Sequence, residues 1–107
     1  MSKKDKIEMI PLLYNITDLI AKKWSMLILR IIYEEKEVRY SNITARLTDI
    51  TPKILSDRLT ELQQKGLINR NVTNNKPVDI RYTLTKKGKG LVKAITPLAK
   101  WAQKWIK

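Results

Sequence analysis

The sequence predicts a mainly helical α+β fold, in which two helices precede a helix pair and a two-stranded hairpin, and one further helix follows them. Three observations support this prediction. Apolar residues recur at helical spacing through most of the chain, residues 67–84 alternate around a turn-rich tip, and capping signals mark both ends of one helix. With 107 residues, 43% of them hydrophobic and 30% charged, the chain suits a single domain over residues 1–107.

Two helices are expected in the first third of the chain. Residues 8–21 carry apolar side chains on more than one face, so we expect this helix to be buried on more than one side. Its main stripe is formed by Met9, Leu13, Ile16 and Ile20. Residues 23–34 have one firm apolar face, formed by Trp24, Leu27, Ile28, Ile31 and Ile32. The charged residues that follow, 34–37, are expected to form a turn.

A pair of helices joined by a short turn is expected next. The first is short, with Ser41 as its N-cap and an apolar pattern of Tyr40, Ile43, Leu47 and Ile50. The second spans residues 51–65, because Thr51 can cap free N–H groups and Pro52 loses no hydrogen bond at the first helical position. Lys65 and Gly66 end this helix. Its core stripe is Leu55, Leu59 and Leu62.

A hairpin and a long helix complete the chain. Residues 67–73 and 78–84 are predicted strands around a tip at residues 74–77. Alternation predicts an inward face of Val78, Ile80, Tyr82 and Leu84 and an outward face of Asp79, Arg81 and Thr83. The last helix is expected over residues 86–106, where Pro97 either kinks it or restarts it with Thr96 as cap. This order is that of a winged helix-turn-helix, whose second helix enters a DNA major groove.

The charge is strongly positive and unevenly distributed. Lys and Arg number 22 against 10 acids, a net charge of +12, and residues 51–107 alone carry 13 basic and 3 acidic side chains. This balance favours a polyanionic partner such as double-stranded DNA. The alternative is a lysine-rich surface that is solvated and binds nothing specific.

The composition excludes most enzyme chemistry. The absence of Cys and His removes thiol nucleophiles, the commonest metal ligands and the commonest general base. No nucleophile-base pair, carboxylate pair or phosphate-cradling glycine loop is visible, so we expect no enzyme, catalytic residue, metal or cofactor. No apolar run approaches the roughly 20 residues of a membrane span, and no secretory signal is visible. We therefore expect a cytoplasmic protein, associated with the nucleoid.

Four segments together resemble one family. They are 18–29 (DLIAKKWSMLIL), 50–62 (ITPKILSDRLTEL), 66–70 (GLINR) and 82–88 (YTLTKKG), in order over nearly the whole chain. They are similar to the HxlR-type transcriptional regulators, relatives of the MarR group. The resemblance implies a dimeric DNA-binding repressor or activator whose N- and C-terminal helices form the dimer interface.

The chain departs from the pattern of this family at several positions. Some members use a cysteine near the position of Pro11 as a redox or electrophile sensor. This chain has no cysteine there, so that sensing chemistry is absent. Ala21-Lys22 stands where Gly-Gly is usual, and Arg81 replaces the acid that commonly precedes the wing tyrosine, which adds positive charge. The proline typical of the start of the last helix is missing, and Pro97 lies one turn later.

The polar face of helix 51–65 supplies the first candidate DNA contacts. With the leucine stripe inward, a rotation of 100° per residue turns polar side chains toward the groove. Lys53 can reach a guanine edge or a phosphate, and Asp57 can accept from cytosine, the alternative being plain solvation. Arg58, at the flank, suits an internal carboxylate as well as a phosphate. The helix contributes Thr51, Lys53, Ser56, Asp57, Arg58 and Thr60.

Further candidate contacts come from the hairpin and from the start of the short helix. Lys76 at the tip and Arg81 on the outward strand face are placed for the minor groove or flanking phosphates, against the alternative of a solvated turn. Arg39, Tyr40 and Ser41 lie where a helix start commonly holds a phosphate. The alternatives are capping for Ser41 and core packing for Tyr40.

The terminal helices carry more apolar surface than a chain of this size should expose. We expect a homodimer interface formed by Leu12, Leu13, Ile16, Leu98, Trp101 and Trp105. Trp24 is expected in the core instead, because it continues an apolar helical stripe.

These features predict a sequence-specific double-stranded DNA-binding transcriptional regulator that acts as a homodimer. Helix 51–65 is expected in the major groove, and the wing, residues 67–84, on the flanking minor groove or backbone. A nonspecific architectural DNA-binding protein is the alternative, since net charge alone would suffice for it. A third possibility, a module that binds proteins or an anionic membrane, is disfavoured by the polar groove face.

Overall fold

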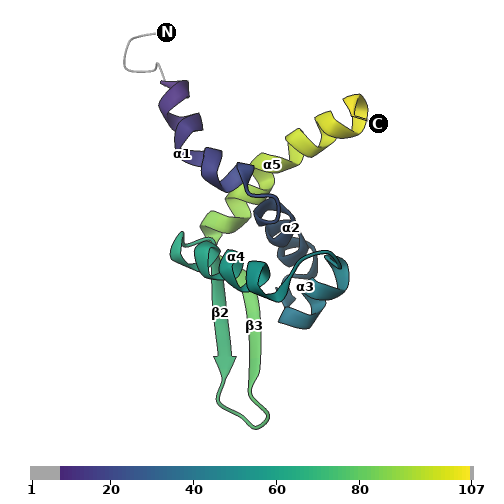
Figure 1. Cartoon of the computed structure of the whole chain (residues 1–107). Coiled ribbons are helices and arrows are strands. Elements are labelled where there is room, and N and C mark those ends of the chain that lie inside the picture. Colours follow the sequence, from purple (N-terminus) through teal and green to yellow (C-terminus); the bar gives the residue numbers. More distant parts are fainter. Residues whose placement is uncertain (1–7, 107) are drawn as a thin grey trace.

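The computed structural model describes residues 8–106 and confirms a mainly helical winged helix-turn-helix (Figure 1). Its three strands form an antiparallel sheet in the order β1-β3-β2. In chain order the elements are α1 (Met9–Ala21), α2 (Ser25–Glu35), β1 (Glu37–Val38), α3 (Tyr40–Arg46), α4 (Pro52–Gln64), β2 (Ile68–Thr73), β3 (Asp79–Leu84) and α5 (Lys86–Trp105). No helix among residues 8–106 is long and apolar enough to cross a membrane.

The core lies where α2, α4 and the sheet meet. Helix α2 buries Ile28, Ile31 and Ile32, as its helical spacing predicts. The predicted face is shifted at one position, because Leu29 is buried and Leu27 is 45% exposed. Helix α4 contributes its predicted leucine stripe, which is buried throughout. The sheet closes the core with Val38, Ile68, Tyr82 and Leu84, and α5 adds Val92. Trp24 packs against this cluster, as predicted.

Local signals set the ends of α4. The Thr51 hydroxyl accepts a hydrogen bond from the backbone N–H of Ile54 at 3.2 Å, so the predicted N-cap is confirmed. At the other end Gly66 takes a φ of +72°, a left-handed conformation that favours glycine. The backbone N–H of Leu67 then donates to the carbonyl of Leu62, which closes the helix before β2 begins.

The hairpin is the wing, and it differs from the sequence prediction in two ways. Residues 34–37 do not simply form a turn: a two-residue strand, β1, begins at Glu37 and pairs with Thr83 and Tyr82 of β3. Val78, predicted to face the core, is exposed because β3 starts at Asp79 and the tip extends beyond the body of the domain (Figure 1). The predicted inward face is confirmed for the other three residues, since Tyr82 and Leu84 are buried and Ile80 packs against the core.

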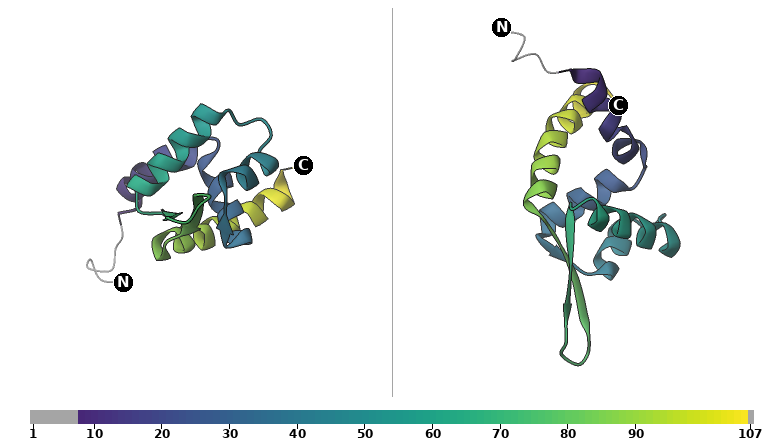
Figure 2. Two further views of the ribbon diagram at one scale, coloured as in Figure 1. Left: turned by 90° about the horizontal axis from the view of Figure 1, so that it is seen from below. Right: turned by 90° about the vertical axis from the view of Figure 1, so that its left-hand side faces the viewer.

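The terminal helices extend away from the body, at the end opposite the wing (Figures 1 and 2). The prediction that α1 is buried on more than one side is wrong for the single chain, since none of its residues is buried. Helix α5 continues through Pro97, so a restart there is also wrong, and the Thr96 hydroxyl donates to the Val92 carbonyl at 2.9 Å instead of capping. The resulting shape measures 59 × 35 × 22 Å.

Candidate nucleic-acid interface

Helix α4 presents a continuous polar face to solvent. Its leucines anchor the opposite side in the core, which fixes the rotation of the helix about its own axis. The exposed residues of this face are Lys53, Ser56, Asp57, Thr60 and Gln64. Lys53 is 85% exposed and lies 3.2 Å from the Asp57 carboxylate, a surface ion pair that is easily exchanged for another partner. The face thus offers both donors and acceptors of the kind that base edges require.

Arg58 lies at the flank of α4 and is held inside the molecule. Its guanidinium donates to both oxygens of Glu61, at 2.7 and 2.8 Å, and its side chain is only 19% exposed. Glu61 also accepts from the Lys22 ammonium at 2.8 Å, which ties α4 to the end of α1. These contacts, the Lys22 hydrogen bond above all, hold the pKa of Glu61 below its usual value. The internal role weighed for Arg58 is the one that this geometry shows.

The start of α3 lies beside the start of α4. Tyr40 is half-buried, and its hydroxyl donates to the Pro52 carbonyl at 3.2 Å, so one side chain links the two helices. Arg39 is the N-cap, not Ser41 as predicted, and its backbone N–H donates to the Asn42 side chain at 2.9 Å. Ser41 is free of that role because it lies inside the first turn, exposed to solvent. Thr51 is also exposed, next to the polar face of α4.

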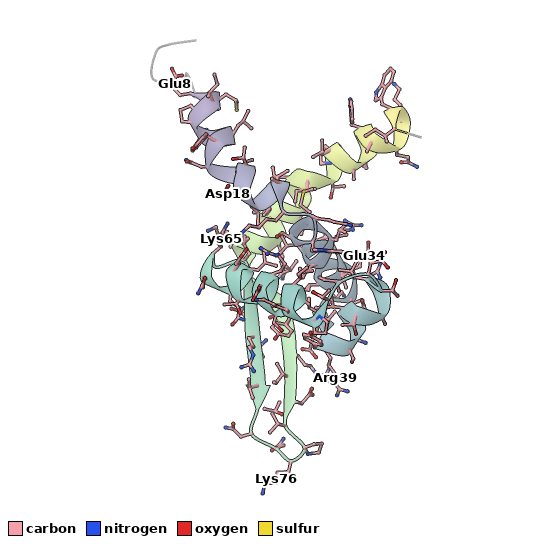
Figure 3. All side chains as sticks on the ribbon, in the orientation of Figure 1. Glu8, Asp18, Glu34, Arg39, Lys65 and Lys76 are labelled. Atoms are coloured by element: carbon pink, nitrogen blue, oxygen red, sulfur yellow. The ribbon has the colours of Figure 1, made fainter. Side chains whose placement is uncertain are left out.

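Basic residues lie at both the tip and the base of the wing. Lys76 lies at the far tip, and Arg39 lies at the base (Figure 3). Arg70 on β2 is exposed as well, a basic residue that the sequence analysis did not single out. Its position opposite Tyr82 follows only from the register of the two strands. The sequence showed an arginine within a predicted strand but not the face to which it belongs.

Arg81, predicted as a DNA contact, is surrounded by carboxylates at the base of the wing. Its guanidinium lies 2.6 Å from Glu37 and 2.9 Å from Asp79, and Asp79 also lies 3.0 Å from Arg39. The hydrogen bonds from Arg81 and then Arg39 lower the pKa of Asp79, and the two carboxylates raise the pKa of Arg81. The positive charge that Arg81 adds to the sequence is therefore balanced in the fold.

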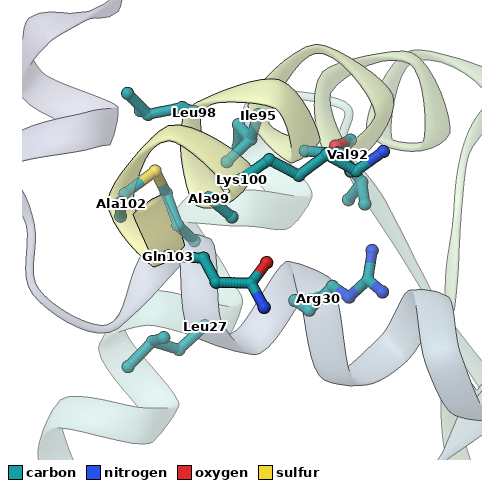
Figure 4. A pocket seen from close by; sticks show the side chains of 11 residues that line it. Leu27, Arg30, Val92, Ile95, Leu98, Ala99, Lys100, Ala102 and Gln103 are labelled. Atoms are coloured by element: carbon teal, nitrogen blue, oxygen red, sulfur yellow. The ribbon is translucent and has the colours of Figure 1, made fainter. Parts of the chain in front are cut away.

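The terminal helices form an exposed apolar surface rather than a polar one. All six residues predicted for a dimer interface are exposed, which leaves the prediction open in the single chain. An open apolar groove of ≈ 530 Å³ lies beside them, between α2 and the second half of α5 (Figure 4). Leu27, Ile95 and Leu98 line it, with Arg30 and Lys100 as its charged neighbours.

Comparison with known proteins places this geometry in a family. Residues 19–107 match the family described as HxlR-like helix-turn-helix. The chain is 37% identical over 99 residues to the HTH-type transcriptional regulator YvaP of Bacillus subtilis strain 168, a match that covers 92% of this chain and 91% of YvaP.

Solved structures share the same fold. The reduced form of the transcriptional regulator YodB from B. subtilis superimposes with a TM-score of 0.81 at 31% identity, covering 92% of this chain and 96% of YodB. A chain from Enterococcus faecalis V583, described as a MarR-family regulator, gives a TM-score of 0.85 at 26% identity, covering 97% of this chain and 94% of that chain.

Proposed function

The chain belongs to the HxlR-like helix-turn-helix family of DNA-binding transcriptional regulators, and we propose that it recognises specific double-stranded DNA sequences as a homodimer. The observation that carries the proposal is the two-sided character of α4. One side is locked into the core by three buried leucines, and the other is a continuous polar surface.

Helix α4 is the recognition helix of this proposal. A helix fits the B-DNA major groove, and three or four side chains normally reach base edges. Lys53, Ser56, Asp57 and Thr60 are the exposed side chains that serve this role. Lys53 exchanges its ion pair with Asp57 for a guanine or a phosphate, which leaves Asp57 to accept from cytosine N4.

Contacts to the DNA backbone hold α4 in place. Thr51, Arg39, Tyr40 and Ser41 lie together where α3 and α4 begin, and the backbone N–H groups there, with the short polar side chains of Ser41 and Thr51, are the groups that bind phosphates. Lys76, at the end of the wing, reaches the flanking minor groove or its phosphates.

A second copy of the chain covers the terminal helices. The radius of gyration is 16.1 Å, compared with about 13 Å for a compact chain of 100 residues, so this fold leaves much of its surface uncovered. Of the large apolar residues that are exposed, most lie on α1 and the second half of α5. Such a surface is typical of an interface between copies, and the neighbouring groove extends it.

The dimer determines the form of the DNA site. A two-fold pair presents two copies of α4, so the site should be a pseudo-palindrome with half-sites one turn of about 10 to 10.5 bp apart, or a multiple of it. Selection of bound sequences from a random DNA pool tests this directly. Enrichment of a palindromic site supports the proposal, whereas binding without enrichment would favour a nonspecific architectural protein.

Substitution of one lysine tests the recognition helix. Lys53→Ala should weaken binding to the selected site by roughly fivefold or more and relax the preference at one base position. Lys93→Ala is the matched control, an exposed lysine on α5. Equal effects of the two substitutions would show that net charge, and not α4, governs affinity.

Substitution of two tryptophans tests the dimer. The wild type should sediment as a dimer at micromolar concentration, and Trp101→Ala with Trp105→Ala should shift it toward monomer and weaken binding to the selected site. Val78→Ala is the control for sedimentation, because Val78 and Trp105 are both 63% exposed but Val78 lies in the wing, just before β3. A monomeric wild type that binds the site with full affinity would refute the dimer.

A further inference from the structure

Four charged residues, each in contact with the next, lie along one face of the sheet at the base of the wing. Glu37 of β1, Arg81 and Asp79 of β3, and Arg39 before α3 are joined in that order, at 2.6, 2.9 and 3.0 Å. We call these four residues the clasp. It links β1, β3 and the start of α3. Glu37 and Arg81, which are in direct contact, lie 44 positions apart in the sequence.

The charge of the clasp sums to zero, with two arginines against two acids. Arg81 bridges two carboxylates, and Asp79 accepts from both arginines: Arg39 donates to both of its oxygens, and Arg81 shares one of them. Isolated surface ion pairs contribute little, but several charges in one network hold a geometry better than a single pair does. If Arg81 turned toward a DNA phosphate, Glu37 and Asp79 would lose a partner while facing a polyanion.

We propose that Arg81 is a positioning residue: the clasp fixes the direction of the wing relative to α3, and Arg81 does not itself contact DNA. The inference rests on the proposed function in one respect, since the wing must lie on DNA for its direction to matter. It revises the direct contact that the sequence alone suggested for Arg81.

Other residues then supply the charge of the wing. Among residues 8–106, neither Arg70 nor Lys76 takes part in an ion pair. Arg70 is opposite Tyr82 and so lies on the other face of the hairpin from the clasp, because cross-strand partners share a face. The hairpin thus has a neutral braced face, and its unpaired positive charges lie on the other face, at Arg70, and at the tip, at Lys76.

The salt dependence of DNA affinity separates the two roles. A cation that neutralises one phosphate adds about 0.9 to the slope of log K against log salt. Arg70→Gln and Lys76→Gln should each reduce the slope by about that amount. Arg81→Gln should weaken binding about fivefold but change the slope by much less than 0.9, because its guanidinium pairs with two carboxylates and neutralises no phosphate. A slope lowered by about 0.9 in Arg81→Gln would overturn the proposal.

Two further variants make opposite predictions for a clasp and for a phosphate contact. Glu37→Gln removes a negative charge near DNA, so affinity should rise if Arg81 binds phosphate and fall if the clasp positions the wing. Arg81→Lys keeps the charge, but a single ammonium replaces the planar fork that bridges Glu37 and Asp79. The clasp therefore predicts weaker binding for this variant, whereas a phosphate contact predicts little change.

A measurement without DNA keeps this inference distinct from the proposed function. Amide hydrogen exchange of β1 and β3 in the free protein should be faster in Arg81→Gln and Glu37→Gln than in the wild type, because the strands lose a brace. Lys76→Gln is the control, and its exchange should match the wild type. Unchanged exchange in both clasp variants would overturn the proposal even if DNA binding were normal. Faster exchange in a protein that bound no DNA would support the brace and count against the proposed function alone.

Discussion

A methyl group added at Gly88 has no room where α4, β2 and α5 meet. A Cβ at this position would lie 2.1 Å from the carbonyl oxygen of Leu67 and 3.2 Å from a side-chain carbon of Leu84. The oxygen cannot easily move away, because it accepts the backbone N–H of Thr85 at 3.0 Å. The Thr85 hydroxyl in turn accepts from the Gly88 N–H at 3.0 Å and donates to the Gly66 carbonyl at 2.6 Å. Gly88→Ala should therefore separate α5 from the start of β2.

The expected loss of stability is the difference between two destabilising contributions and one stabilising contribution. Overpacking of this kind costs about 1–3 kcal/mol, and a broken hydrogen bond adds about 1 kcal/mol. Alanine recovers about 1 kcal/mol of helix propensity. The net destabilisation should be about 2 kcal/mol, or a fall in Tm of about 8–16 °C at this chain length.

Gly90→Ala is the matched control, since the same substitution one half-turn later meets open space. No atom lies within 4 Å of a Cβ there, so only the propensity gain remains and stability should rise by about 0.5–1 kcal/mol. Urea unfolding followed by far-UV circular dichroism measures both variants. Protein concentration must be held fixed, because a dimer couples stability to concentration. A Gly88→Ala protein as stable as Gly90→Ala would refute the reasoning.

Three further changes in stability are expected, each measured by urea unfolding without DNA. Lys36 has a φ of +67°, a backbone conformation that costs a residue with a side chain roughly 1–2 kcal/mol. Lys36→Gly should therefore raise the free energy of unfolding by up to about 1 kcal/mol, once the greater entropy of glycine in the unfolded chain is subtracted. A lower free energy of unfolding would contradict the strain. Thr51→Ala removes the N-cap of α4 and should lower the free energy of unfolding by about 1 kcal/mol. An unchanged free energy of unfolding would mean that the capping hydrogen bond contributes nothing to stability. The pKa of Asp79 is lowered by Arg81 and then Arg39, so its charged form contributes stability above the unfolded pKa of about 3.9, and that contribution is lost as pH falls through the lower folded pKa. Asp79→Asn should therefore be less stable than the wild type at pH 7, and the difference should shrink as pH falls below about 3.9 and through the lower folded pKa. A constant difference over this pH range would exclude the ion pair as its cause.

Local chemistry made some elements predictable. Helix α4 could be placed from the sequence because a threonine cap, a proline at the first position and a final glycine act within a few residues of each end. The leucine stripe then determined which side of α4 faces solvent. The polar face of α4 could therefore be predicted from spacing alone.

Non-local pairing accounts for the misses. Strand β1 has two residues and forms only because β3 lies beside it, so no pattern within residues 37–38 could predict it. The same pairing brings Glu37 beside Arg81, a contact that the sequence around Arg81 does not indicate. Alternation also failed for Val78, since a strand that extends past its domain has no core to face.

The wrong prediction that α1 is buried has a different cause. An apolar pattern reflects the total burial of a helix, whether its partner belongs to the same chain or to another copy. In the single chain α1 has no buried residue, although Leu12, Leu13 and Ile16 repeat at helical spacing. The proposed dimer accounts for both facts, because it supplies the second surface that the pattern requires. In the proposed dimer, the terminal helices set the distance between the two copies of α4. That distance in turn determines the spacing of the half-sites that the protein can bind.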